Sequence, residues 1–287
     1  MLSAMIPARR RQAVALMLAA TVLAGLDAVI VRSLAGGVHP LMIAFFRALF
    51  GLLAILPWIV LRVDLRASPY RGLHVLRAAL KQASLVAMFL AFTHAPLADA
   101  TAISFTTPIF LTLGAWLVLR ERVDVARLAG VAAGFLGILV VVRPASGSFD
   151  PWLLAALAGA VLTALIQLVL RRMAQRDTAQ RLVAWNLLAM APLGLAGALP
   201  VWVAPTPQEL GLLAVQGVLG ALNMTLITRA FGLAEASLLA PLDFLRLPVV
   251  ALLAYAFFAE RVAPATWLGG AFIILAAILA GWSGRRR

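Results

Sequence analysis

The sequence predicts an all-α integral membrane protein with ten transmembrane helices, built as two inverted five-helix repeats. The first observation is composition: 64% of the 287 residues are hydrophobic and only 12% are charged, which a water-soluble fold could not bury. The second is that the apolar residues form runs of about twenty, the length of a helix that crosses a bilayer. The third is an internal repeat. Barrel strands would instead alternate polar and apolar residues, and this alternation is absent.

Short Arg-rich or Pro/Gly-rich segments separate the apolar runs. The first run follows Arg9, Arg10 and Arg11, as in a signal peptide, but it continues to about Ile30 and is too long for a cleaved segment. We therefore interpret it as the first span. In order, the expected spans are Ala13–Ser33, Pro40–Leu61, Val75–Ala95, Ala98–Leu119, Val125–Val142, Pro151–Leu170, Leu182–Val203, Leu210–Phe231, Ser237–Phe258 and Pro264–Trp282.

Basic residues are distributed unevenly over alternate connections. One set holds only Arg32, Arg143 and Arg261. The other holds Arg9 to Arg11, Arg62, Arg66, Arg71, Arg77, Arg120, Arg122, Arg127, Arg171, Arg172, Arg176, Arg181, Arg229 and Arg285 to Arg287. Because cytoplasmic loops are enriched in Arg and Lys, we expect a multi-pass protein of the bacterial cytoplasmic (inner) membrane with both termini in the cytoplasm. The formal charge of +13 then reflects topology, and we expect no nucleic-acid partner.

The two halves of the chain align with each other at one constant offset. The matched stretches run from Ala91-Phe92 through Glu121-Arg122-Val123 to Gly130, and from Ala230-Phe231 through Glu260-Arg261-Val262 to Gly269. We expect residues 1–145 to form the first five-helix repeat and residues 146–287 the second. An odd number of spans separates equivalent points, so the repeats should be inverted, an arrangement typical of secondary transporters.

Several stretches make the chain similar to the EamA-type branch of the drug/metabolite transporter superfamily over essentially its whole length. They are His39-Pro40 with Phe46-Arg47, the run from Ala91 to Pro108, the Glu121-Arg122 turn, and the run from Ala234 to Pro248. The resemblance implies a ten-helix fold with a central cavity and alternating access. Around Phe46-Arg47 and Ile103 to Pro108 it is closest to S-adenosylmethionine and riboflavin uptake members. It implies a small polar metabolite as substrate, either an amino acid or a nucleotide- or cofactor-like compound.

Charged residues inside the predicted spans are functional candidates, because a bilayer accommodates them only when they are paired or face water. Asp27 and Arg47 both lie about 10 Å below the same surface, so they can pair, either as a structural link or beside the substrate. Lys81 either extends to the interface or points inward, where it would bind an anionic or carboxylate-bearing substrate. Asn223 can supply a hydrogen bond to the cavity or to a neighbouring helix.

A second candidate set lies on the fourth and ninth spans. Asp243 and Arg246 share one face of the ninth span, and the repeat offset places Ser104 and Thr107 at the equivalent positions of the fourth. Both spans contain prolines that can break a helix and act as hinges. These are Pro108, Pro241 and Pro248. Broken helices at matching positions of inverted repeats indicate a transport site; the alternative is a structural kink with a local ion pair.

The sequence therefore predicts a carrier that binds its substrate near the bilayer midplane, between the repeats. A zwitterion would suit the mixed charges, and Asp27 or Asp243 could couple transport to protons. An intramembrane enzyme and a channel-like facilitator stay open as alternatives, although we find no metal motif, no Ser/His/Asp set on adjacent elements and no repeated selectivity ring. We expect no catalytic residue, no bound metal and no cofactor.

Two further features bear on partners. The chain has no cysteine, which excludes disulfides, thiolate nucleophiles and Cys-ligated metals. Gly130, Gly134 and Gly137 form a small-residue face on the fifth span. Such a face predicts close helix packing, either within the chain or across a homodimer.

Overall fold

The computed structural model describes residues 2–119, 125–143, 150–173, 176–233, 239 and 242–282, and the regular structure in these ranges is helical. The helices are α1 (Leu2–Ser33), α2 (Pro40–Arg62), α3 (Arg71–His94), α4 (Leu97–Ser104), α5 (Thr107–Leu119), α6 (Val125–Val142), α7 (Leu153–Met173), α8 (Ala179–Ala198), the 3-10 turn η1 (Leu199–Val201), α9 (Pro207–Leu233), α11 (Arg246–Phe258) and α12 (Pro264–Trp282). The prediction of an all-α membrane protein is confirmed for this part of the chain.

Seven helical segments among the described residues are long and apolar enough to cross a bilayer. Three shorter apolar helices accompany them, at Ala129–Val142, Arg246–Phe258 and Pro264–Leu275. Together these segments fit the ten expected spans. The helix bounds of α6 and α12 agree with the expected fifth and tenth spans, whereas α1 begins at Leu2 because the arginine-containing segment before Ala13 continues the same helix.

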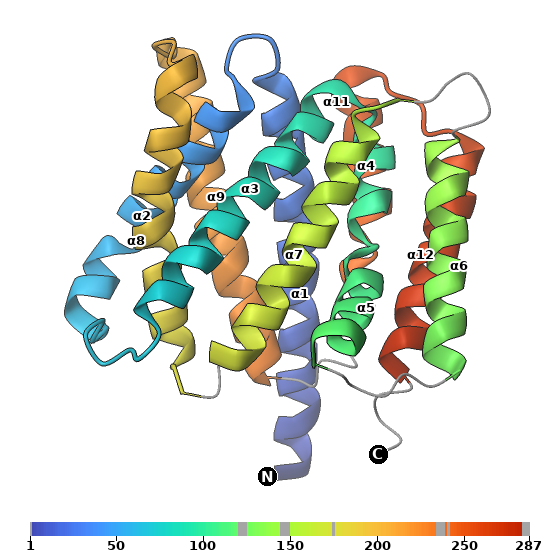
Figure 1. Ribbon diagram of the computed structural model, residues 1–287, viewed down its shortest axis with the longest axis horizontal. Helices are drawn as coiled ribbons and strands as arrows, with labels where there is room; N and C mark the ends of the chain where they lie inside the picture. The colour runs from blue at the N-terminus through green and yellow to red at the C-terminus, as the bar shows by residue number, and fades with distance from the viewer. Residues whose placement is uncertain are drawn as a thin grey trace.

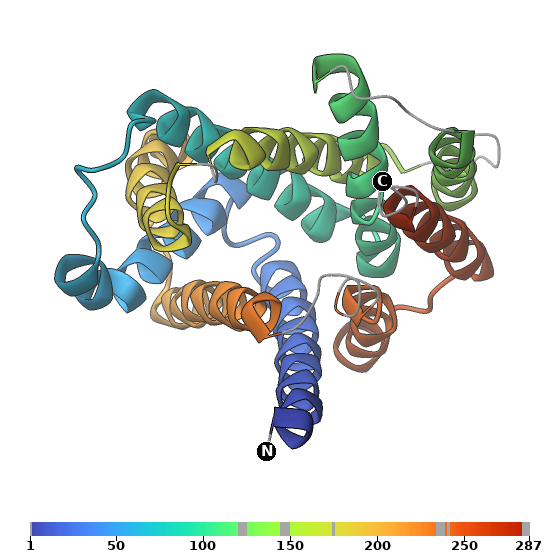
Figure 2. The same cartoon turned by 90° about the horizontal axis from the view of Figure 1, so that it is seen from below.

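The helices form one bundle in which the long helices run between two opposite ends (Figure 1). We call the end where α1 begins and α12 ends the termini face, and the opposite end the far face. α7 begins at the far face, so it runs opposite to α1. Seen from the termini face, α2 and α8 lie at one edge of the bundle, α6 and α12 at the other, and α1 and α7 between them (Figure 2).

Helix contacts in the bundle come in matched couples. α1 packs on α9 while α7 packs on α3, α2 contacts α9 while α8 contacts α3, and α11 contacts α1 while α5 contacts α7. In addition, α2 packs on α8, α4 on α11, and α6 on α12, the last being the most extensive contact. These three couples join helices that the sequence offset makes equivalent, whereas the contacts of α3 with α1 and α2 have no counterpart of similar extent between α9 and α7 or α8.

The fourth and ninth spans are both interrupted. α4 ends at Ser104 and α5 begins at Thr107, while α11 begins at Arg246. The offset that aligns the halves makes Thr107 and Arg246 equivalent, so the two new helices start at the same repeat position. In the α4–α5 turn, hydroxyl groups satisfy carbonyls that the break releases: Thr107 Oγ1 donates to Ser104 O at 2.9 Å, and Thr106 Oγ1 donates to Ile103 O at 2.7 Å.

The prolines of these spans begin helices instead of bending them. Pro108 is the second residue of α5 and Pro248 the third residue of α11. In the first turn of a helix the amide N–H has no intrahelical partner, so proline is tolerated there and its fixed φ favours the start of the helix. Pro241 lies outside the described residues. In the described residues, each break that was expected to act as a hinge is therefore a turn, and a proline in the first turn of the next helix stabilises it.

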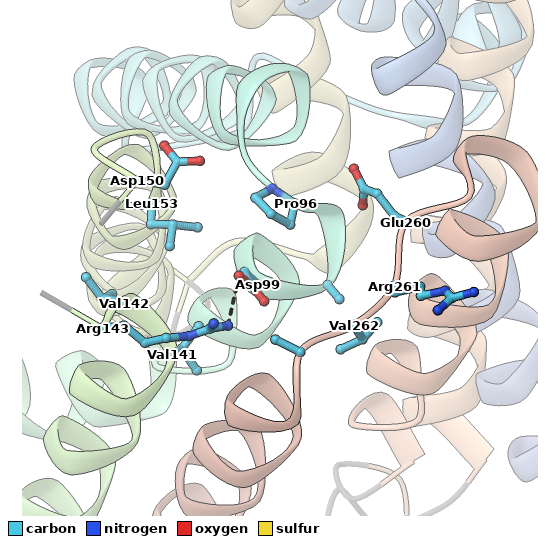
Figure 3. Close-up of a pocket in the computed structure, with 12 residues that line it drawn as sticks. Pro96, Asp99, Val141, Val142, Arg143, Asp150, Leu153, Glu260, Arg261 and Val262 are labelled. Carbon is cyan, nitrogen blue, oxygen red and sulfur yellow. Dashed lines mark ion pairs between the residues drawn. The ribbon is translucent and has the colours of Figure 1, made fainter. Parts of the chain in front are cut away.

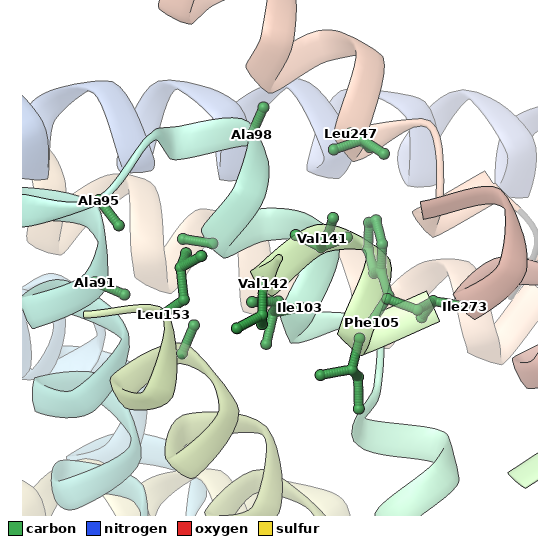
Figure 4. Packing of buried hydrophobic residues seen from close by; sticks show 14 of the residues in the cluster. Ala91, Ala95, Ala98, Ile103, Phe105, Val141, Val142, Leu153, Leu247 and Ile273 are labelled. Atoms are coloured by element: carbon green, nitrogen blue, oxygen red, sulfur yellow. The ribbon is translucent and has the colours of Figure 1, made fainter. Parts of the chain in front are cut away.

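Buried side chains fix α4 against three other helices. Figure 4 shows Ile103 and Phe105 from the α4 region together with Val141, Leu247 and Ile273 from α6, α11 and α12. Because lipid is as apolar as these side chains, close packing rather than the hydrophobic effect holds such helices together. The cluster keeps the break of the fourth span beside that of the ninth.

α6 and α12 approach each other closely at two glycines. A Cβ on Gly137 would lie 2.8 Å from the carbonyl oxygen of Gly269, and a Cβ on Gly269 would lie 2.7 Å from that of Gly137. These distances are too short for any side chain, so both positions require glycine for the backbones to meet. Of the two alternatives for the small-residue face, Gly137 thus packs within the chain.

Candidate functional site

Asp27 and Arg47 form the predicted ion pair, which joins α1 to α2. The Arg47 guanidinium also lies 5.8 Å from the centre of the Phe89 ring on α3. A Cβ on Gly220 would lie 2.9 Å from the guanidinium carbon, so the guanidinium packs directly against α9 at this glycine. Gln216, one turn earlier on α9, lies beside the Asp27 carboxylate. Four helices therefore enclose the pair.

Lys81 lies near the middle of α3. At 1.5 Å per residue its Cα is about 15 Å from one end of the helix and about 20 Å from the other, too far for the side chain to reach either interface. The charges of Asp27, Arg47 and Arg246 act on its amine, and these residues come from α1, α2 and α11. The amine of Lys81 is thus far from both ends of α3 and within electrostatic reach of three other helices.

Arg246 joins the two broken helices. Its Nη2 donates to Oγ of Ser104 at 3.1 Å, and its guanidinium carbon lies 4.9 Å from the centre of the Phe105 ring. The rings of Phe105 and Phe244 meet edge to face with their centres 5.2 Å apart. Nη2 of Arg246 is also 3.9 Å from the Asp243 carboxylate. Ser104 and Arg246, predicted from opposite halves, are thus in direct contact.

Thr107 and Asn223 form no hydrogen bond with the other predicted site residues' side chains in the described part of the chain. The Thr107 hydroxyl is engaged with the Ser104 carbonyl, so it stabilises the turn. Asn223 follows Gly220 by one turn of α9, and its amide oxygen is buried without a hydrogen-bond partner in the described part of the chain. The Asp27–Arg47 pair and the Arg246–Ser104 contact are separate. The amine of Lys81 is subject to the charges of Asp27 and Arg47 in the first and to that of Arg246 in the second.

The far face holds an ion pair that sequence reasoning missed. Arg32 at the end of α1 contacts Glu260 after α11, with Nη2 to Oε1 at 2.9 Å. Arg32 also donates to the carbonyls of Phe92 and Ala95, at 3.2 Å each. The second Glu260 oxygen accepts the backbone N–H of Leu97 at 3.1 Å. These bonds tie together the far-face ends of α1, α3, α4 and α11.

A cavity of about 260 Å³ lies beside this ion pair (Figure 3). Among its lining residues, Asp99 accepts a hydrogen bond from Thr266 and lies 3.8 Å from Arg143. A signal for this cluster was present in the loop charges: Arg32 and Arg143 are two of only three basic residues in this set of connections. Each has a carboxylate partner, which explains why these arginines lie on the far face.

At the termini face, Ser68, His74 and Asp177 form a buried cluster. Ser68 Oγ donates to Asp177 Oδ2 at 2.6 Å, and His74 Nε2 lies 3.1 Å from the same oxygen and 2.9 Å from Ser68 Oγ. Arg181 donates to the other carboxylate oxygen at 3.0 Å, and Trp185 stacks on the His74 ring. The expectation that no such set would lie on adjacent elements was wrong.

The geometry of this cluster favours a structural role. The hydroxyl and the imidazole converge on one carboxylate oxygen, whereas a nucleophilic serine needs the imidazole between itself and the acid. All three side chains are buried, so no substrate can reach them. The cluster instead joins the α2–α3 connection to the α7–α8 connection, which are more than a hundred residues apart in the sequence.

Asp177 should make the stability of this link depend on pH. Burial would raise the pKa of its carboxyl, but hydrogen bonds from Ser68, Arg181 and His74 outweigh burial and hold the pKa below its usual value of about 3.9. Because the folded pKa is the lower one, the stabilisation is complete above about pH 4 and is lost as the pH falls through the folded pKa. We expect the midpoint temperature of unfolding to decrease as the pH is lowered below about 4. The decrease should be smaller for Asp177→Asn. Parallel pH profiles for the two proteins would contradict this.

Comparison with known proteins identifies the family. Two segments, residues 11–143 and 150–282, match the EamA-like transporter family. The chain is similar to a riboflavin transporter of Vibrio cholerae, at 30% identity over 275 residues and 92% of each chain. It is also similar to an S-adenosylmethionine uptake transporter of Rickettsia prowazekii, at 29% identity over 244 residues, which cover 84% of this chain and 82% of that one.

A riboflavin transporter of Brucella anthropi is 32% identical over 254 residues, which cover 84% of this chain and 88% of that one. A solved crystal structure has a TM-score of 0.61 at 23% identity and covers 99% of this chain and 98% of that one, which supports the fold alone. Because the family matches span nearly the whole chain, the protein is a multi-pass membrane protein that belongs to the EamA-like transporter family, within the drug/metabolite transporter superfamily.

Proposed function

We propose that the protein is a secondary transporter that moves a small polar metabolite across the bacterial inner membrane by alternating access. Its working parts are two inverted five-span repeats, residues 1–145 and 146–287. The two family matches, the opposite directions of α1 and α7 and the matched helix contacts support this arrangement. The Arg-rich connections support cytoplasmic termini.

The observation that carries this proposal is the contact between two broken helices at equivalent repeat positions. Arg246 donates to Ser104 across the break. Irregular backbone at membrane depth is tolerated only where protein or a water-filled cavity surrounds it. The substrate would bind here, between Ser104, Arg246 and Asp243, with the Asp27–Arg47 pair nearby. Thr107 and Asn223 complete the proposed pathway, and the breaks act as hinges.

Movement of the halves would require contacts at one face to open. At the far face these include the Arg32–Glu260 ion pair and the bond from Thr266 to Asp99. Both join residues of the first half to residues of the second. Their loss would separate the halves there while the Ser68–Asp177 link at the termini face stays closed. Alternating access needs such separable contacts at each end.

The relatives indicate the substrate class. Riboflavin and S-adenosylmethionine, named for the relatives, are both polar, planar-ring metabolites, and we propose a compound of that kind. Asp27 and Asp243 are the proposed sites of proton coupling. An intramembrane enzyme is a weaker alternative, because the Ser68 cluster is sealed from substrate. Trans-stimulated counterflow in vesicles would separate a carrier from an enzyme and from a channel.

Asp243→Asn is expected to lower uptake into proteoliposomes by about tenfold, because it removes one charged contact of the substrate without removing packing. The measurement is counterflow of radiolabelled riboflavin and S-adenosylmethionine. Asp64→Asn is the control, since Asp64 is an exposed carboxylate in the α2–α3 connection. Equal uptake by Asp243→Asn and the control would count against this site. Absence of counterflow in the unmodified protein with all metabolites tested would count against the transport function.

A further inference from the structure

Two of the arginines inside the spans have a carboxylate partner. Arg47 is paired with Asp27, and Arg246 has the Asp243 carboxylate within 3.9 Å. Lys81 lies near the middle of α3 and is subject to the charges of Arg47 and Arg246. It forms no hydrogen bond and no ion pair with any residue that the structure describes. The positive charge of Lys81 therefore has no ion-pair partner among the described residues.

The position of Lys81 makes this imbalance costly. An ammonium group near the middle of a bilayer must be paired or face water, and Lys81 is too far from both helix ends to extend to an interface. Its side chain is half-buried, so the amine keeps some exposed surface. Among the described residues that act on its charge, only Asp27 supplies a carboxylate, and Arg47 already engages that group.

The surrounding residues also contain unused donors. Nε of Arg246 is buried with no acceptor in the described part of the chain, and so is Nε of Arg77, one turn before Lys81 on α3. The charges of both arginines oppose that of Lys81. The cluster therefore has more cationic donors than acceptors. A bound anion would supply both the missing charge and the missing acceptor oxygens.

We propose that Lys81 binds an anionic group of the transported compound, a carboxylate or a phosphate. The proposal rests on the transport function proposed above and narrows it: the substrate is a metabolite with at least one negative group, and an uncharged analogue is bound more weakly. Lysine acts as a compact point charge, so it serves either anion.

The test measures unfolding of the purified protein in nanodiscs, with sodium acetate, sodium phosphate or sodium chloride at equal ionic strength. Unmodified protein should be stabilised by acetate or phosphate relative to chloride, because a ligand of the folded state raises its stability. Lys81→Gln should lose this difference and Lys81→Arg should keep it. General salt effects act on all three proteins alike. The acetate and phosphate arms distinguish the two anions.

A second measurement uses the fact that Lys81 is the only lysine of the chain. Acylation of Lys81, followed by mass spectrometry of the peptide, should slow at least severalfold in the anion that stabilises the protein. Without any added anion, Lys81→Gln should be at least as stable as the unmodified protein, because the substitution removes an uncompensated charge. This result would exclude misfolding as the reason for lost anion binding.

Equal effects of acetate, phosphate and chloride on the unmodified protein and on Lys81→Gln would overturn the proposal, as would acylation at an unchanged rate. Counterflow separates failure of the anion-site proposal from failure of the transport function. If metabolites are exchanged but Lys81→Gln exchanges them equally well, transport stands and the anion site falls. If the anion effects depend on Lys81 but no metabolite is exchanged, the anion site stands and the transport function falls.

Discussion

Replacing Arg47 by Gln is expected to lower the free energy of unfolding by about 3–5 kcal/mol, because it leaves the Asp27 carboxylate unpaired inside the bundle. The double variant Asp27→Asn/Arg47→Gln should recover most of this loss, since neither charge then remains. Unfolding of the unmodified protein, Asp27→Asn, Arg47→Gln and the double variant in one detergent, measured by denaturant titration, tests the order. The two single effects should therefore be strongly non-additive.

Arg62→Gln is the matched control, because Arg62 is exposed at the end of α2 and its loss removes the same charge without leaving a buried partner. A double variant less stable than Arg47→Gln would refute the pairing argument. Transport by the double variant then decides between the two roles left open for this pair. Normal counterflow would make it a structural link, and lost counterflow in a stable protein would place it beside the substrate.

Gly137→Val is expected to destabilise the protein by about 1–3 kcal/mol or more. The new Cβ would lie 2.8 Å from the Gly269 carbonyl oxygen and 3.1 Å from the amide nitrogen of Ile273. Both are backbone atoms, so no side chain can rotate away, and α6 must separate from α12. The expected result is a lower unfolding midpoint in detergent and a lower yield of folded protein.

Gly211→Val is the corresponding control, because a Cβ on Gly211 meets no atom within 4 Å. Valine there should leave stability unchanged or raise it slightly, since glycine is a poor helix residue. If Gly137→Val were as stable as Gly211→Val, the α6–α12 contact would not depend on backbone approach. In that case Ala or Ser would also serve at both glycine positions.

Sequence alone determined the membrane class, the approximate limits of the spans and the pairing of Asp27 with Arg47. These follow from local properties of the chain: span length is set by bilayer thickness, and depth by counting residues from a span end. The breaks of the fourth and ninth spans were also foreseen, since proline cannot continue a helix. The structure changed the interpretation of these prolines, because Pro108 and Pro248 lie in the first turn of the next helix.

Only the tertiary structure decided which polar groups meet. The contact of Arg246 with Ser104 and the Ser68–His74–Asp177 cluster both depend on how helices distant in sequence are rotated and packed. In a water-soluble helix a polar face marks the outside. In a membrane, lipid and protein interior are equally apolar, so hydropathy does not tell which face of a helix points inward.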